Sequence, residues 1–253
     1  SVMAEHGLSG KAAAFVFDGT GYGTDGTIWG GEILLLEGNQ MVRAGHLDAM
    51  PLLGGDVSMK QAWKTGLASL VYAGLPAEDH RYGLVKAALE AGVNIIRDSA
   101  MGRLFDSAAA LLHLKEENRF KGECAMALEQ AALRAKRKGK AALPLHLSLK
   151  EEKGQLIWHR EDLIASLVEA DGTIEEAALG FHRAIVDMVV ESARLLGVEQ
   201  VILTGGCFHN GILWTETKKA LTKEHFKVYG NEKVPCGDGG IALGQAFYGL
   251  MQG

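Results

Sequence analysis

The chain has 253 residues, of which 33 are glycine and only 4 are proline. Its apolar fraction of 47% and charged fraction of 23% supply enough hydrophobic material for a core, which excludes a mainly disordered protein. A formal net charge of −5 argues against a general binder of nucleic acid or of membrane surfaces. Three widely spaced cysteines, no signal-peptide pattern and no apolar run of roughly 18 residues predict a cytoplasmic protein.

The first half of the chain reads as a strand meander followed by helices. Short apolar runs that are separated by glycine-rich turns, one of them Gly38-Asn39, predict strands at 11–17, 27–36 and 41–47. Apolar residues at helical spacing predict helices at 62–71, 81–91, 101–114 and 123–136. The basic stretch 134–154 is interpreted as a solvated, irregular segment, because no aromatic residue interleaves with its charges.

The last hundred residues alternate between helix and strand. We expect helices at 174–196, 212–222 and 241–251 and strands at 200–204 and 226–229, with Gly197 ending the first helix. This alternation predicts an α/β protein with a largely parallel sheet covered by helices.

The loop Asp18–Gly23 has the composition of a phosphate-binding turn. Its glycines allow backbone N–H groups to converge on an anion, Thr20 adds a hydroxyl donor, and Asp18 offers a carboxylate to a metal or a reacting group. A glycine-rich hairpin between two strands has the same composition, so both interpretations remain open at this point.

Two further loops carry polar residues beside glycine. The diglycine Gly205-Gly206 follows a predicted strand, where a ligand approaches the backbone closely, but neither the Rossmann nor the P-loop spacing is present. Cys207 with His209 as its base is a candidate nucleophile, although a structural cysteine beside a polar histidine is favoured. Asp238 is either a helix N-cap or a ligand for a cation that bridges phosphates. Together the three loops predict a nucleotide cleft between two lobes.

A succession of longer motifs resembles one known family. The segments are DGTGYGTDGTIWGGE at 18–32, GGD at 54–56, SAMGRLFD at 99–106, GE at 122–123, the turn at 205–210, and DGGIALGQA at 238–246. In this order they resemble the C-terminal domain of the HypF carbamoyltransferases, which act in the maturation of [NiFe]-hydrogenases, and the resemblance extends over the whole chain.

This resemblance implies a fold and a reaction. The fold is the two-lobed actin and sugar-kinase type (ASKHA), related to the tRNA threonylcarbamoyl-transferases, with a nucleotide between the lobes. The reaction uses carbamoyl phosphate and ATP to form carbamoyl-adenylate, and the carbamoyl group then passes to the C-terminal cysteine thiol of a HypE-type partner. A divalent metal, either Mg, Zn or Fe, beside the phosphates would stabilise the departing AMP.

The resemblance also assigns residues. Asp18 and Asp238 correspond to the catalytic, metal-binding carboxylates. The expected nucleotide-binding residues lie in three segments: Gly19, Thr20 and Gly21; Gly102 and Asp106; and Gly205, Gly206 and Asn210.

The chain departs from the family pattern at its beginning. The family's H-H-x-x-H-type metal motif comes immediately before a segment like SVMAEHGL, which here starts at Ser1. We therefore interpret the chain as a fragment with an incomplete first lobe at 1–115 and a second lobe at 116–253, whose last helix returns to the cleft. His6 is not expected to replace the two histidines. Carbamoyl phosphate and ATP would be handled by upstream modules, turnover by the fragment alone should be low, and an exposed sheet edge predicts a homodimer.

Two alternatives remain open. The first is another enzyme of the same fold, a tRNA threonylcarbamoyl-transferase or an O-carbamoyltransferase. The second is a non-catalytic module that binds a nucleotide or a partner. Binding of ATP with Mg²⁺, and its loss on changing Asp238, distinguishes the second alternative from an empty scaffold.

Overall fold

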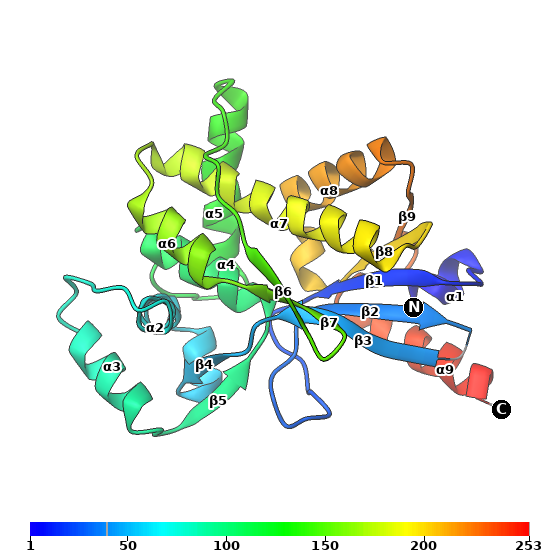
Figure 1. Cartoon of the computed structure of the whole chain (residues 1–253), viewed down its shortest axis with the longest axis horizontal. Helices are drawn as coiled ribbons and strands as arrows, with labels where there is room; N and C mark the ends of the chain where they lie inside the picture. Colours follow the sequence, from blue (N-terminus) through cyan, green and yellow to red (C-terminus); the bar gives the residue numbers. More distant parts are fainter. Residues whose placement is uncertain (39, 253) are drawn as a thin grey trace.

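A computed structural model describes residues 1–38 and 40–252 and shows helices packed on a central sheet (Figure 1). The sheet has seven strands in the order β6-β7-β3-β2-β1-β8-β9. The strands are β1 (Ala12–Phe17), β2 (Gly31–Glu37), β3 (Gln40–Leu47), β6 (Ser148–Glu152), β7 (Gln155–His159), β8 (Gln200–Thr204) and β9 (Lys227–Gly230). The three strands predicted in the first fifty residues are confirmed, and Asn39 of the predicted turn lies outside the described residues.

The sheet is mixed, and its parallel part includes the strands of the last hundred residues, as their alternation with helices predicts: β8 pairs in parallel with β1 and with β9. A third parallel pair joins β3 to β7. The meander β1-β2-β3 and the hairpin β6-β7 are antiparallel. Only two residues separate β2 from β3 and β6 from β7, and connections this short can join only antiparallel neighbours.

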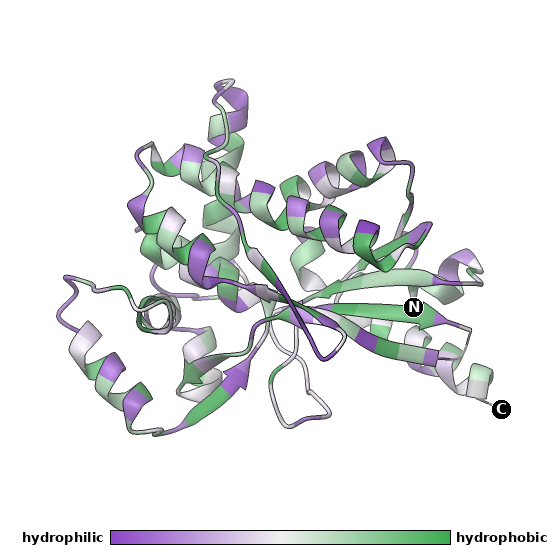
Figure 2. Ribbon diagram, in the orientation of Figure 1, coloured by the Kyte–Doolittle hydropathy of each residue, from purple (hydrophilic) through white to green (hydrophobic). Residues whose placement is uncertain are grey.

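Alternation of side chains along β1 divides the core between the two faces of the sheet. Phe15 and Phe17 enter the main core, which contains residues of the long helix α7 such as Phe181. Ala12 and Ala14 point to the opposite face and pack in a smaller cluster with Val2. Apolar residues therefore cover β1 on both faces, which accounts for its uninterrupted apolar sequence (Figure 2).

Helices predicted from apolar spacing are all present. They are α2 (Ala62–Tyr72), α3 (Tyr82–Glu90), α4 (Met101–Leu111), α5 (Glu123–Arg137), α7 (Ile174–Leu196), α8 (Gly211–Lys223) and α9 (Ile241–Gln252). The boundaries of α7 have clear causes. Thr173 and Glu176 form a reciprocal capping box at its start, and Gly197 adopts φ 58° at its end.

Several elements were not expected. A second, two-stranded sheet pairs β4 (Met50–Leu53) with β5 (Ile95–Asp98) and lies beside α2 and α3 at one end of the molecule (Figure 1). The others are α1 (Val2–His6), α6 (Glu161–Glu169) and the short 3₁₀ helices η1 (Gly55–Met59), η2 (Gly206–His209) and η3 (Asp238–Gly240). The stretch 134–154, predicted as a solvated helix end and loop, is confirmed at its start, since α5 ends at Arg137. It is wrong at its far end, where residues 148–152 form β6 and pair with β7, neither of which was expected.

Strands from both halves of the chain share the main sheet, so the predicted division between residues 115 and 116 does not separate two sheets. The division of the chain into two lobes at this point stays a prediction. Within the described part of the chain, no helix is both long and apolar enough to cross a lipid bilayer.

Candidate functional site

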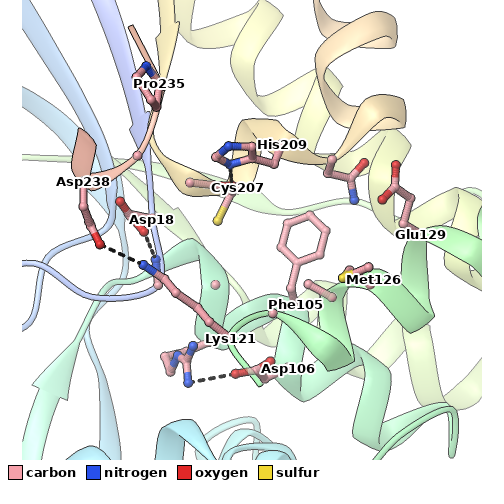
Figure 3. Close-up of a pocket in the computed structure, with 18 residues that line it drawn as sticks. Asp18, Phe105, Asp106, Lys121, Met126, Glu129, Cys207, His209, Pro235 and Asp238 are labelled. Atoms are coloured by element: carbon pink, nitrogen blue, oxygen red, sulfur yellow. Dashed lines mark hydrogen bonds and ion pairs between the residues drawn. The ribbon is translucent and has the colours of Figure 1, made fainter. Parts of the chain in front are cut away.

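Three loops that are far apart in the sequence meet at one cavity of about 560 Å³ (Figure 3). Its wall comes from the end of β1, the start of α4, the start of α5, the turn after β8 and the loop before α9. The lining residues are Asp18, Gly19, Gly102, Arg103, Phe105, Asp106, Lys121, Gly122, Ala125, Met126, Glu129, Gly206, Cys207, His209, Asn210, Pro235, Gly237 and Asp238.

The turn after β1 is fixed by hydrogen bonds to its neighbours. The Asp18 side chain accepts a hydrogen bond from the Gly19 amide at 2.7 Å, and the Asp18 carbonyl accepts one from the Gly102 amide at 3.0 Å. A Cβ on Gly102 would lie 2.6 Å from the Gly19 Cα, so only glycine allows α4 to approach this closely. The N-terminus of α4 is thereby held against the turn that carries Asp18.

The diglycine after β8 also brings backbones together. Gly205 adopts φ 100°, its amide donates to the Cys236 carbonyl at 2.9 Å, and a Cβ there would lie 2.3 Å from the Phe17 carbonyl oxygen. A Cβ on Gly206 would come within 3.1 Å of an Asp18 carboxylate oxygen. The two glycines therefore connect the Asp18 turn to the Cys236 loop.

A buried ion pair forms part of the wall. Arg103 Nη1 lies 2.8 Å from Asp106 Oδ2, and the Asn118 side-chain amide donates to Asp106 Oδ1 at 3.1 Å. Burial raises the pKa of Asp106 above its ordinary value, although Arg103 opposes this shift. Arg103 Nε is buried and has no hydrogen-bond partner among the described residues. The guanidinium group thus has donor capacity to spare beside the Gly19 turn.

A second cation lies at the cavity mouth. Lys121 Nζ is 3.3 Å from Asp238 Oδ2, and both side chains are about three-quarters exposed. Because this ion pair is exposed, an anionic ligand can draw Lys121 away from Asp238 at little cost.

The remaining wall is mostly apolar. Asp18 and Asp238 lie at one end of the cavity, whereas Phe105 and Met126 lie toward the other (Figure 3). The cavity therefore combines a charged end with a surface on which a flat ring can rest.

Comparisons with known proteins place the chain in a family. A family model described as "Carbamoyltransferase, Kae1-like Domain, second subdomain" matches residues 14–245. A carbamoyltransferase HypF homolog of Cupriavidus necator is 33% identical over an alignment that covers all of this chain and 68% of that relative. The chain belongs to the HypF carbamoyltransferase family. A HypF carbamoyltransferase of Synechocystis is also 33% identical, and there the alignment covers 97% of this chain but 35% of the relative.

Solved HypF structures share the fold. Full-length HypF in a phosphate- and nucleotide-bound form superposes with a TM-score of 0.87 at 30% identity, over all of this chain and 35% of that one. HypF of T. kodakarensis gives a TM-score of 0.79 at 29% identity over 99% of this chain and 35% of its own. The mixed α/β chain therefore has the two-lobed ASKHA-type fold.

Most of the residues expected from the HypF resemblance meet at the cavity. Asp18, Gly19, Gly102, Asp106, Gly206, Asn210 and Asp238 all line it, whereas Thr20, Gly21 and Gly205 do not. Thr20 is exposed, and the Gly21 carbonyl accepts from the Trp29 amide in a hairpin. The loop thus lines the cavity at Asp18 and Gly19 and continues into a glycine-rich hairpin, so phosphate binding by its first residues stays a prediction.

Asn210 has a structural role in this HypF-family chain. Its Oδ1 accepts from the Leu213 amide at 2.9 Å and caps α8, while its Nδ2 lies 2.9 Å from His182 Nε2. His182 Nδ1 is 2.7 Å from the Ala178 carbonyl, which can only accept, so Nδ1 carries the proton and Nε2 accepts from Asn210. Burial lowers the pKa of His182 to about 4, which is consistent with the neutral ring.

The cysteines are not activated nucleophiles. Burial raises the pKa of Cys207, Cys236 and Cys124 above the ordinary thiol value, so all three are thiols at neutral pH. The thiol near His209 is that of Cys236, with Sγ 3.5 Å from Nδ1. His6 contacts the Gly230 carbonyl and does not line the cavity.

Sequence reasoning missed the cationic and apolar walls. Arg103 is adjacent to the expected Gly102, and Lys121 precedes the expected Gly122-Glu123 motif. Their position beside these motifs was the only available signal, because a single arginine or lysine is common on any helix.

Proposed function

We propose that this chain is the carbamoyl-transfer domain of a hydrogenase-maturation carbamoyltransferase and that the cavity holds carbamoyl-adenylate formed from carbamoyl phosphate and ATP. The acceptor is the C-terminal cysteine thiol of a HypE-type partner protein. The observation that carries the proposal is the joining of three loops, with Asp18, Arg103 and Asp238, around one cavity with a charged end and an apolar end.

The polarity of the cavity suggests the orientation of the ligand. The adenine ring rests on the apolar side near Phe105 and Met126, and the phosphate faces the Gly19 turn. Arg103, whose Nη2 is the nitrogen next to Gly19, donates to the phosphate, and Lys121 leaves Asp238 to neutralise the same charge. Full-length HypF of similar fold has been solved in a phosphate- and nucleotide-bound form, which supports a nucleotide as a ligand of this family.

A divalent ion, either Mg, Zn or Fe, fits the donors at the charged end. Asp18 and Asp238 both line the cavity and offer carboxylate oxygens, the ligand type that Mg²⁺ prefers and that Zn²⁺ and Fe²⁺ accept. Such an ion would supply charge stabilisation for the phosphate leaving group. In the transfer itself, the partner's thiol releases its proton to solvent, its sulfur bonds to the carbamoyl carbon, the carbon–oxygen bond to the phosphate breaks, and AMP leaves with the negative charge near Arg103.

Calorimetric titration with AMP and with ATP plus Mg²⁺ tests the cavity. We expect binding that weakens at least about tenfold in Asp238→Ala and Arg103→Met. Transfer to a peptide with the partner's C-terminal cysteine then tests the reaction. Binding without transfer would indicate a non-catalytic nucleotide module, and no binding at millimolar nucleotide would refute the cavity assignment.

A further inference from the structure

Three ionisable side chains converge away from the nucleotide cavity, where the two sheets meet. Asp48 directly follows β3 and lies two residues before the start of β4, His159 ends β7, and Glu161 begins α6. The backbone brings them together, since the Asp48 amide donates to the Trp158 carbonyl at 2.9 Å. None of the three side chains lines the nucleotide cavity.

Their ligand atoms have nearly the spacing of a metal site. One atom from each residue lies within 4.8 Å of the other two. His159 Nδ1 is 3.4 Å from Glu161 Oε2 and 4.0 Å from Asp48 Oδ2. Ligands at ordinary zinc distances in a tetrahedron are about 3.4 Å apart, so metal binding requires the three groups to move closer by up to about 1.4 Å.

The same atoms lack other partners. Asp48 is only 3% exposed, and apart from the neighbouring Tyr72 hydroxyl its Oδ2 has no hydrogen-bond partner among the described residues. Both ring nitrogens of His159 and Glu161 Oε2 are likewise buried without one. Leaving buried polar atoms unsatisfied costs about 1–3 kcal/mol each, so three such atoms facing one point favour an occupant.

The surroundings orient Asp48 as a ligand. Arg160 is fully buried, and its Nε donates to Asp48 Oδ1 at 2.7 Å, which leaves Oδ2 directed at His159. Arg160 also donates to the backbone carbonyls of Asp48 and Asp98, which disperses its charge. Tyr72 lies beside Asp48, and burial together with that carboxylate raises the pKa of its phenol, which stays neutral. Contacts of this kind fix the orientation of metal-binding carboxylates.

We propose that Asp48, His159 and Glu161 bind a divalent transition-metal ion of the Zn²⁺ type, which joins the β7–α6 junction to the β3–β4 junction. One imidazole and two carboxylates form a ligand set that suits Zn²⁺ better than Mg²⁺, which prefers oxygen alone. The negative charges of Asp48, Glu161 and the neighbouring Glu152 balance those of the ion and of Arg160. The alternative occupant is a proton, with the histidinium paired to Asp48, Glu161 and Glu152, whose Oε1 is 3.7 Å from His159 Nε2.

The test must separate this site from the carboxylates of the nucleotide cavity. The 253-residue chain carrying Asp18→Asn and Asp238→Asn is freed of metal and titrated with Zn²⁺ by calorimetry, and with Co²⁺ by visible absorption. We expect one equivalent of Zn²⁺ to bind and to raise the unfolding temperature. Adding His159→Ala should weaken this binding at least about 100-fold, because a direct ligand matters more than its supporting contacts.

His146→Ala is the matched control, because His146 is an exposed histidine elsewhere on the chain, and it should leave Zn²⁺ binding unchanged. If His159→Ala fails to fold, Glu161→Gln at the start of α6 carries the same expectation of weaker binding. No binding to the doubly substituted chain at millimolar Zn²⁺ would overturn the proposal. So would equal affinity with and without His159 or Glu161, since the cluster would then hold only a proton. Neither result depends on nucleotide binding, so the proposed carbamoyl transfer is tested separately.

Discussion

Arg103 lies where α4, the Gly19 turn and the cavity meet. Its Nη1 is paired with Asp106, and its Nε is free of hydrogen bonds among the described residues. Replacing it by methionine keeps the unbranched apolar stem of the side chain but removes the charged guanidinium group. The loss of one charge-assisted hydrogen bond, about 1.5–3 kcal/mol, should weaken AMP binding about 10- to 100-fold in calorimetry.

Two further variants show whether a loss of AMP affinity comes from the missing charge or from lower stability of the fold. Arg103→Met also leaves Asp106 buried without its cation, so Arg103→Met with Asp106→Asn should recover stability but not affinity. Arg183→Met removes an arginine that pairs with an aspartate on the exposed face of α7 and should bind AMP normally. Equal affinities for the two arginine variants would exclude Arg103 from the phosphate site.

His182 gives the fold a defined dependence on pH. Its pKa is about 4 in the folded chain, against 6.5 ordinarily, because burial disfavours the charged ring. The unfolded chain therefore binds more protons between these values, and stability falls as the pH decreases from about 6.5 to about 4. From pH 7 to 5 this one residue should cost about 2 kcal/mol of unfolding free energy.

Urea unfolding at pH 7 and 5 measures this effect. His182→Gln keeps a hydrogen-bond acceptor for Asn210 but does not titrate, so its stability should change less between the two pH values. The comparison between variants is needed because burial raises the pKa of Asp98 to about 6, which opposes the trend in both chains. If the unfolding free energy changed by the same amount between pH 7 and 5 in both chains, His182 would take up a proton as readily in the folded chain as in the unfolded one.

At the scale of elements, the N-terminus of α4 depends on Gly102. A methyl group there would lie 2.6 Å from the Gly19 Cα, so Gly102→Ala must push α4 away from the Asp18 turn. We expect a loss of about 1–3 kcal/mol in unfolding free energy and weaker nucleotide binding.

Gly83→Ala is the matched control for Gly102→Ala. Gly83 is also the second residue of its helix, α3, but a Cβ there meets nothing within 4 Å. Alanine should therefore be neutral or stabilise by up to about 1 kcal/mol. If urea unfolding gave equal changes in unfolding free energy for the two substitutions, helix propensity, and not the close approach of α4 to Gly19, would determine the effect at Gly102.

Elements with a long apolar repeat were predictable from sequence, and short elements paired across the chain were not. The stripe along α7 and its stop at Gly197 could be read directly. By contrast, β4 and β5 have four residues each and pair across more than forty residues, so neither carries its own periodicity. The charged sequence of β6 resembles that of a solvated loop, because the exposed residues 150–152 lie at the edge of the sheet.

The candidate site shows the same limit at a smaller scale. Glycines mark close approach in the sequence, and Gly19, Gly102 and Gly206 do line the cavity. Gly205 carries the same signal but packs against Phe17 instead. Whether a glycine faces a ligand or another strand depends on tertiary contacts that sequence does not encode locally.

At the scale of the whole molecule, β6 forms one edge of the main sheet, and within the described residues no strand pairs with its outer side. An antiparallel pairing of β6 with its copy about a two-fold axis at Glu151 places Lys150 opposite Glu152 of the second chain, twice over by symmetry. Opposite charges at these positions favour the homodimer expected from an exposed edge. We therefore expect light scattering at high concentration to give about twice the chain mass of 27.1 kDa.

The same pairing predicts how the homodimer is lost. Glu152→Lys places lysines opposite one another and should return the mass to that of one chain, whereas Glu169→Lys, an exposed residue at the end of α6, should not. Added salt should weaken the dimer, because salt screens exposed charge pairs. The screening length is about 10 Å at 0.1 M ionic strength and becomes shorter at higher ionic strength. A single-chain mass for the unsubstituted protein at low salt would rule out pairing through β6, since the charges on that edge would then serve to prevent strand addition.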